Sequence, residues 1–329
     1  MTWHLTKKIL LAYFSVASAL TALPGSSQAQ VPSTIKLVVP YPPGGSVDTL
    51  ARFLQAPLQE QLKTTVIVEN KPGAGGRIAA SQVKREPADG SVVLIAPNAL
   101  TTMQSLVYAG RLDYSVVDDF TPVSRLVAYP FGIAVAANSA VKTVSDMRKH
   151  IKASPDNANY GTSGAGGMAH FSGLAFAKAA GLEWNHIAFK GGAPLITDLI
   201  GGHIPYAVDT LIDQIEHHRA GKIRVLGVLS SNRFPLAADI PTFSEQGVAN
   251  LPSIEGWFGA FVPAKTPKEM VSKLDMAFAK ILSDASLKAK LNKMVIEVSY
   301  LQSSEFTALQ KNELQQWAPV VKESGFKPE

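Results

Sequence analysis

Cysteine is absent from the 329 residues. The chain therefore has no disulfide, no thiolate metal site and no cysteine nucleophile, and its fold must be held by packing alone. The chain also has little excess of one sign of charge, with 31 Lys and Arg against 26 Asp and Glu. The basic residues are scattered along the chain, so the charge pattern gives no support for nucleic-acid binding. The 46% hydrophobic content can form a large core, and the length suggests two domains.

Long apolar runs are equally scarce. The one clear run, of about 15 residues at 9–23, follows Lys7 and Lys8 and precedes small residues that include Ser27 and Ala29. It is shorter than the roughly 20 residues that span a bilayer, so the pattern predicts a secretory signal peptide over residues 1–29, with a retained anchor as the alternative. No cysteine follows the run, so we do not expect a lipid anchor. Without the peptide, the formal charge falls from +5 to +3.

The remaining chain alternates short β-branched runs with amphipathic stretches, which is typical of parallel α/β folds. A first series has strands at 34–40, 64–70 and 91–97, with helices at 46–62 and near 77–85. A second series has strands at 159–163, 186–189, 206–209 and 224–229, with helices near 168–180, 194–200 and 211–220. Each series resembles a doubly wound α/β domain.

Two long β-rich passages, 121–137 and 253–264, separate these series and are the natural interdomain crossings. After them, Thr266 as N-cap, Pro267 as first helical residue and Glu269 as capping-box acid predict a helix to about residue 282. A last helix is expected at about 304–323. We therefore predict that residues 31–130 plus 255–329 form one domain and that residues 131–254 form a second, inserted domain.

Small, open loops follow several of the predicted strands, at 41–48, 97–102, 162–170 and 190–194. Ligands of α/β domains bind at the carboxyl ends of strands, where glycines allow close approach and helix N-termini favour anions. An anion, and in particular a carboxylate, is the expected guest. The candidate ligand-binding residues are Tyr41, Pro43, Gly44, Gly45, Ser46, Asp48, Asn98, Thr162, Ser163, Gly164, Gly166, His170 and Asp209.

Several of these candidates have an alternative structural role. Ser46 and Asp48 are also typical helix-start residues, and a carboxylate beside a bound anion is costly unless the ligand carries an ammonium group. Asp48 and Asp209 would contact the amine if the ligand were an amino acid. His170 lies just after the glycine loop and would face either the cleft or the core.

Seven segments carry a resemblance to a known family: VVPYPPGGSVDTLARFL, VENKPGAGGRIAASQVKREPADG, DDFTPVSRL, NYGTSGAGGMAHFSGLAF, FKGGAPLITDLIGGHI, IPTFSEQG and GWFGAFVPAKTP. In this order they resemble the Bug family of receptors of tripartite tricarboxylate transporters, over essentially the whole chain after residue 30. Phe189, Ser91 and the stretch 112–114 depart from the usual family pattern, but none lies in the two main glycine loops.

The resemblance implies a periplasmic binding protein of the type II-like Venus-flytrap class, with a ligand cleft between two α/β domains. It implies that loops 42–46 and 162–167 hold a ligand carboxylate. The expected function is capture of a small carboxylate (a dicarboxylate, tricarboxylate, acidic amino acid or aromatic acid) in the periplasm, followed by delivery to the membrane subunits of the transporter. We expect a monomer without cofactor.

The predicted capture occurs by hinge closure around the ligand. An alternative is a receptor that uses the same closure to engage a periplasmic sensor domain. Gly164, Gly166 and Ala169 satisfy the G-x-G-x-x-A spacing of a dinucleotide-dependent enzyme, but export removes such an enzyme from its cofactor pool. Ser163 lacks the G-x-S-x-G context of a hydrolase nucleophile, and the histidines show no metal-ligand spacing. We therefore expect neither an enzyme nor a metal site.

Overall fold

The structure is a computed structural model that describes residues 30–328, and residues 31 onward form one compact unit. The predicted signal peptide, residues 1–29, lies outside the described residues. Within the described chain, no helix combines the length and the apolar character that crossing a membrane requires. The predicted strands and helices are confirmed to within a few residues.

One group of strands has the order β2-β1-β3-β9-β4. Parallel pairing joins β1 (Thr34–Val39) to β2 (Thr65–Asn70) and to β3 (Val92–Pro97). The later strand β9 (Glu255–Pro263) pairs antiparallel with β3, and β10 (Glu297–Leu301) pairs antiparallel with β4 (Phe120–Ala136). The chain thus returns to its first strands after residue 254.

A second group of strands has the order β4-β7-β5-β6, with β8 also on β4. Parallel pairs join β5 (Asn159–Thr162) to β6 (Asn185–Ala188) and to β7 (Tyr206–Thr210). Both β7 and β8 (Ile223–Val228) run antiparallel to β4. The ends of β1 and β5 therefore open into the two glycine loops identified in the sequence.

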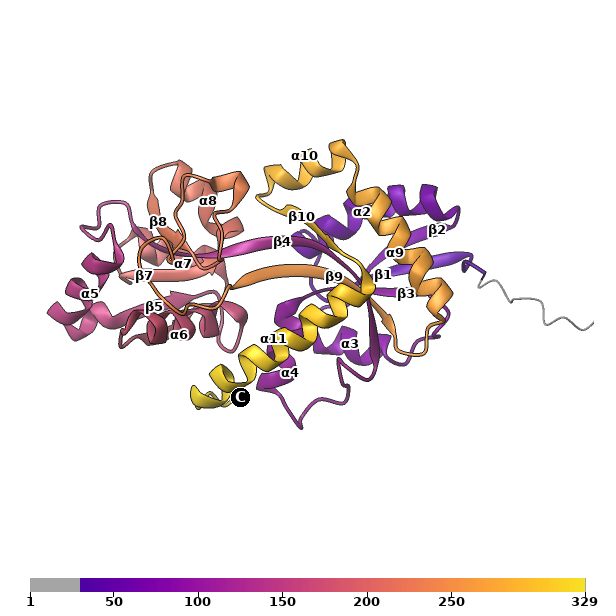
Figure 1. Ribbon diagram of the computed structural model, residues 1–329, viewed down its shortest axis with the longest axis horizontal. Helices are drawn as coiled ribbons and strands as arrows, with labels where there is room; N and C mark the ends of the chain where they lie inside the picture. Colours follow the sequence, from indigo (N-terminus) through magenta and orange to yellow (C-terminus); the bar gives the residue numbers. More distant parts are fainter. Residues whose placement is uncertain (1–29, 329) are drawn as a thin grey trace, which may run out of the picture. The chain divides into compact units, whose positions relative to one another are not determined.

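Strand β4 (Phe120–Ala136) is shared by the two groups (Figure 1). Up to Pro130 it pairs with β9, and from Phe131 it pairs with β7. Pro130 has no N–H to donate to a ladder, so the change of partner occurs where the backbone hydrogen bonds must be interrupted. The two passages β4 and β9, which the sequence marks as crossings, connect the groups.

Ten helices flank the strands in the described chain. They are α2 (Ser46–Leu62), α3 (Arg77–Val83), α4 (Gln104–Val107), α5 (Val144–Ala153), α6 (Met168–Ala180), α7 (Gly192–Ile200), α8 (Leu211–Arg219), α9 (Lys268–Leu282), α10 (Ala285–Lys293) and α11 (Ser303–Glu323). The last of them, α11, contacts both β4 and α6, so it reaches from one strand group toward the other (Figure 1).

The predicted start of α9 is wrong in detail. The helix begins at Lys268, Pro267 occupies the N-cap position, and no side chain caps the helix. The Thr266 hydroxyl is buried and has no hydrogen-bond partner among the described residues. The N–H groups of Met270 and Val271 both donate to the Pro267 carbonyl. Because Thr266 is buried one residue before the N-cap position, its hydroxyl does not cap the helix as the sequence predicts.

The core of the second group depends on the close approach of α6 to β5. A Cβ atom built on Gly173 of α6 would lie 2.3 Å from the Tyr160 ring of β5. Tyr160 is fully buried and stacks on Trp184, with ring centroids 4.8 Å apart. Only glycine allows α6 to pack this closely to the ring.

We predict that Gly173→Ala destabilises the protein. Alanine favours a helix interior by roughly 1 kcal/mol over glycine, but overpacking against a fixed ring costs about 1–3 kcal/mol, so the clash should dominate. Urea unfolding measures the difference. Gly164→Ala is the matched control, since its Cβ would meet no atom within 4 Å; equal stability of the two variants would contradict this packing.

Candidate functional site

The first glycine loop, residues 41–48, joins β1 to α2. Pro43, Gly44 and Gly45 are exposed, and Ser46 is the first residue of the helix. Gly44 has a φ of +91°, which favours glycine. Gly45 occupies the N-cap position, where no side chain bonds to the first turn of α2. The loop thus leaves first-turn N–H groups of α2 without a side-chain acceptor.

Asp48 holds this loop in shape. Its carboxylate accepts hydrogen bonds from the Gly44 N–H at 2.9 Å, from Arg52 Nε at 2.9 Å and from Asn70 Nδ2 at 2.8 Å. Burial by itself raises the pKa of Asp48, but the bonds from Arg52, Gly44 and Asn70 outweigh burial and lower that pKa to about 2. Asn70 also donates to the Tyr41 carbonyl at 3.1 Å. Both oxygens of Asp48 are engaged inside the protein, which is a positioning role.

The second glycine loop, residues 162–170, joins β5 to α6. The buried Thr162 hydroxyl donates to the Gly164 carbonyl at 2.7 Å and lies 2.7 Å from His186 Nε2. The Gly166 N–H donates to His170 Nδ1 at 3.1 Å. His170 is buried and stacks on His186, with centroids 3.8 Å apart, and burial lowers its pKa to about 4. His170 therefore faces the core and fixes the loop as a neutral ring.

Ser163 and Asp209 are brought together from β5 and β7. The Ser163 hydroxyl donates to Asp209 Oδ1 at 3.0 Å, and the Thr210 N–H donates to the same oxygen at 2.9 Å. Asp209 Oδ2 is buried and has no partner in the described chain. Burial and then the nearby Asp213 carboxyl raise the pKa of Asp209 to about 7. Asp209 is the predicted site carboxyl that keeps a free oxygen.

Tyr129 of β4, which was not predicted as a site residue, is buried and interacts electrostatically with residues of both sets. Burial raises the pKa of its hydroxyl, and Tyr41, Asp213 and Asp209 raise it further. Tyr41 comes from the first loop and Asp209 lies on β7, so residues of both strand groups contribute to this shift. The only feature of the sequence that could have pointed to Tyr129 is its position in the middle of the predicted crossing 121–137.

Asn98 is not brought to either loop. It is fully buried, and its Nδ2 donates to the Glu255 carbonyl of β9 at 2.9 Å. Beside it, Trp257 Nε1 and the Thr102 hydroxyl donate to the Glu313 carboxyl at 2.7 and 3.0 Å. Asn98 thus belongs to a buried polar cluster that joins β3, β9 and α11.

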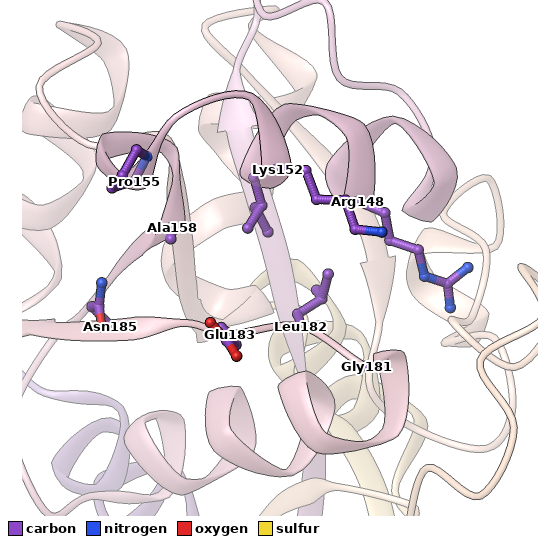
Figure 2. Close-up of a pocket in the computed structure, with 9 residues that line it drawn as sticks. Arg148, Lys152, Pro155, Ala158, Gly181, Leu182, Glu183 and Asn185 are labelled. Carbon is purple, nitrogen blue, oxygen red and sulfur yellow. The ribbon is translucent and has the colours of Figure 1, made fainter.

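A pocket of about 560 Å³ lies elsewhere, in the second strand group (Figure 2). Its walls come from α5, the end of α6 and the start of β6, and include Arg148, Lys152, Gly181 and Glu183. None of the predicted ligand-binding residues lines it. Arg148 is engaged with the Ala180 carbonyl at 3.1 Å, which links α5 to α6.

The buried Asp209 predicts a pH dependence of stability. Because its folded pKa is about 7, the folded chain binds more protons at this site than the unfolded chain between about pH 4 and pH 7. The free energy of unfolding from this group therefore falls as the pH rises through that window. Asp209→Asn removes this titration. Between pH 5 and pH 8, the free energy of unfolding of the wild type should therefore fall by about 2–3 kcal/mol more than that of Asp209→Asn.

Thermal unfolding at pH 5 and pH 8 measures this difference. Asp198→Asn is the matched control, because Asp198 is half-buried on α7 and forms no ion pair within the described residues. An Asp209→Asn stability gain that is the same at both pH values would contradict the burial of an ionisable carboxyl.

The sequence and the fold resemble those of known proteins. A family model described as "Tripartite tricarboxylate transporter family receptor" matches residues 50–326. Rpa4515 of R. palustris, solved with adipate, is similar with a TM-score of 0.78 and 31% identity, over 90% of this chain and 98% of that one. MatC of Rhodopseudomonas palustris, solved with bound malate, gives a TM-score of 0.73 and 26% identity over 88% and 98%.

The periplasmic binding protein BugD is similar with a TM-score of 0.74 and 28% identity, over 91% of this chain and 100% of that chain. These likenesses confirm the predicted fold class, the two-domain α/β Venus flytrap of periplasmic binding proteins. The family and these structural neighbours are solute-binding receptors and not enzymes. The chain therefore belongs to the tripartite tricarboxylate transporter receptor family, which its Bug-like motifs predicted.

Proposed function

We propose that this protein captures a small dicarboxylate between loops 41–48 and 162–167, closes around it, and delivers it to the membrane subunits of a tripartite tricarboxylate transporter in the periplasm. The observation that carries the proposal is the pair of glycine loops, one at the end of β1 and one at the end of β5. Each leads directly into a helix whose N-cap residue, Gly45 or Gly167, provides no side-chain acceptor.

The loops suit a carboxylate for a simple physical reason. First-turn N–H groups of α2 and α6 have no acceptor within their helices, and the positive end of each helix dipole favours an anion. A carboxylate would satisfy these donors without an Arg or Lys at the same point. The Gly44 N–H, by contrast, already donates to Asp48. We therefore assign Gly45 and Ser46 as the donors to the ligand.

Ser163 and Asp209 would contact a polar group beside that carboxylate. The unpartnered Oδ2 of Asp209 can accept from a ligand hydroxyl or amine when ionised, and can donate to a ligand oxygen when protonated. Its pKa near 7 allows both forms at neutral pH. We assign Asp48, Thr162, His170 and Asn98 to positioning, because their polar atoms are already engaged within the protein.

Closure would occur at the crossings. We propose the domain bounds 31–130 plus 255–329 and 131–254, and the change of partner of β4 between Pro130 and Phe131 supports them. Few strands cross between the two groups, so a rotation there would disturb few ladder hydrogen bonds. The adipate and malate held by the similar receptors are both dicarboxylates, which supports the ligand class.

A thermal-shift and calorimetric series tests the binding site. Adipate or malate at about a hundred times its dissociation constant should add about 2.7 kcal/mol to the free energy of unfolding. Gly45→Leu should abolish this gain, because a side chain would fill the loop while its backbone (φ −74°) already suits any residue. Ser163→Ala should weaken binding about threefold to tenfold.

Asn312→Leu is the control for added bulk, since it places the same side chain on an exposed face of α11. Normal ligand stabilisation of Gly45→Leu would overturn the assignment of loop 41–48. No stabilisation by any dicarboxylate, tricarboxylate, acidic amino acid or aromatic acid, in protein refolded free of bound small molecules, would overturn the proposed function.

Small-angle scattering tests closure separately. We expect the radius of gyration to fall when a ligand that stabilises the protein is added, because the two domains would rotate together about β4 and β9. An unchanged scattering curve at saturating ligand would contradict the hinge and leave the binding site itself in place.

A further inference from the structure

A second polar feature borders the proposed site. A cavity of about 360 Å³ has Gly75, Arg77, Gln104 and Tyr108 on one side and the stretch 165–167 of the second glycine loop on the other. The side chain of Phe326, from the end of the chain, completes the wall. None of the residues on the Arg77 side belongs to the site predicted from the sequence.

This cavity borders the second glycine loop, with which it shares Gly166 and Gly167. Gly76, between the lining residues Gly75 and Arg77, packs against Pro40, the residue before the first loop, so closely that an added Cβ would lie 3.0 Å from the proline side chain. A ligand bound at the second loop would therefore have the cavity beside it.

The guanidinium of Arg77 is fixed in this wall. Its Nη1 donates to Gln104 Oε1 at 3.2 Å, and Gln104 Nε2 in turn donates to the Gly75 carbonyl at 2.7 Å. The Arg77 guanidinium carbon lies 3.8 Å from the centre of the Tyr108 ring. A planar group held on both sides loses little entropy when it binds a further partner.

Arg77 has no carboxylate partner within the described residues, where the ion pairs involve other cations. A guanidinium has five N–H donors, and the protein hydrogen bond just described uses one. Arginine is suited to two-pronged recognition of a carboxylate. A half-buried cation with free donors beside a ligand cleft is therefore suited to an anionic group of the ligand.

Acidic and basic side chains lie on different sides of the proposed site. Asp209 and Asp213 lie at the β7 side, while Arg77 lies at the α3 side. An aromatic acid would be expected to stack on Tyr108, but Arg77 already covers one face of that ring and Arg111 lies 5.7 Å from its centre. The arrangement favours a second anionic group over an aromatic ring.

We propose that Arg77 binds the second carboxylate of a dicarboxylate whose first carboxylate lies between the two glycine loops. The inference rests on the proposed function and deepens it, because it assigns the residue that distinguishes dicarboxylates from monocarboxylates. Gln104 and Tyr108 act as positioning residues that orient the guanidinium.

Isothermal titration with chain-matched acids tests this assignment. The probes are succinate, glutarate, adipate and pimelate, each paired with the monocarboxylate of the same carbon number, butanoate to heptanoate. In wild type, the best dicarboxylate should bind at least about 10-fold more tightly than its partner acid. Arg77→Gln should weaken that dicarboxylate about 10- to 100-fold and leave the monocarboxylate unchanged.

Arg111→Gln is the matched control, because Arg111 lies near the same ring, donates to the Pro328 carbonyl and does not line the cavity. It should bind both acids as wild type does. If Arg77→Gln fails to fold, the wild-type pairs and their salt dependence still decide: the preference for the dicarboxylate should shrink as ionic strength rises.

Equal affinity of wild type for the two acids of every pair would overturn the assignment of Arg77, while the proposed function would stand. Equal losses of affinity for the dicarboxylate in Arg77→Gln and Arg111→Gln would also overturn the assignment of Arg77. Binding of an aromatic or amino acid in preference to every dicarboxylate would overturn both the Arg77 assignment and the proposed dicarboxylate ligand. The absence of any binding would overturn the proposed function itself.

Discussion

The antiparallel pairing of β4 with β9 is the constraint on which the rest of the structure depends. These strands join the two sheet groups, and their register brings Tyr129 opposite Gly256. Gly256 lies so close to the Tyr129 ring that an added Cβ would be 2.1 Å from it, so the crossing is tightly packed. Because the loops at the ends of β1 and β5 belong to different groups, their separation is set by this crossing.

The loops themselves are shaped by polar groups that have no need of a ligand. Asp48 holds Gly44, and His170 holds Gly166, each through a backbone N–H. These bonds leave the neighbouring amides free and in fixed positions, so a bound carboxylate would replace water without reorganising the two loops. Preorganised donors of this kind gain affinity because the cost of ordering the loop is met during folding.

The sequence predicted most of the fold because hydrophobic periodicity is strong here. Buried runs such as 34–39 and 92–97 can pack only as strands covered on both faces, and glycines after strands mark the loops. The start of α9 was misplaced, because the burial of Thr266 depends on tertiary packing. Helices α5 and α10 were missed because their mostly polar sequences bury few residues.

The positions of the two glycine loops were predictable from the sequence, but the contacts of individual side chains in them were not. Asp48 and Asp209 have the same side chain, yet one is saturated by Arg52 and Asn70 and the other keeps an unpartnered oxygen. That difference arises from residues distant in sequence. Likewise, Arg77 follows a glycine motif like any helix-start residue, and only the fold sets it opposite residues 165–167.

The central claim is that the ligand lies between the two glycine loops, and selective ¹⁵N labelling of glycine tests it most directly. Some of the 25 glycines lie in each loop, so their amide signals report on the two loops separately. During a titration with adipate, the amide signals of Gly45 and Gly164 should move most, while those of Gly110 and Gly221 stay in place. Binding accompanied by shifts at Gly181, which lines the separate pocket of Figure 2, and none at Gly45 or Gly164, would contradict the account.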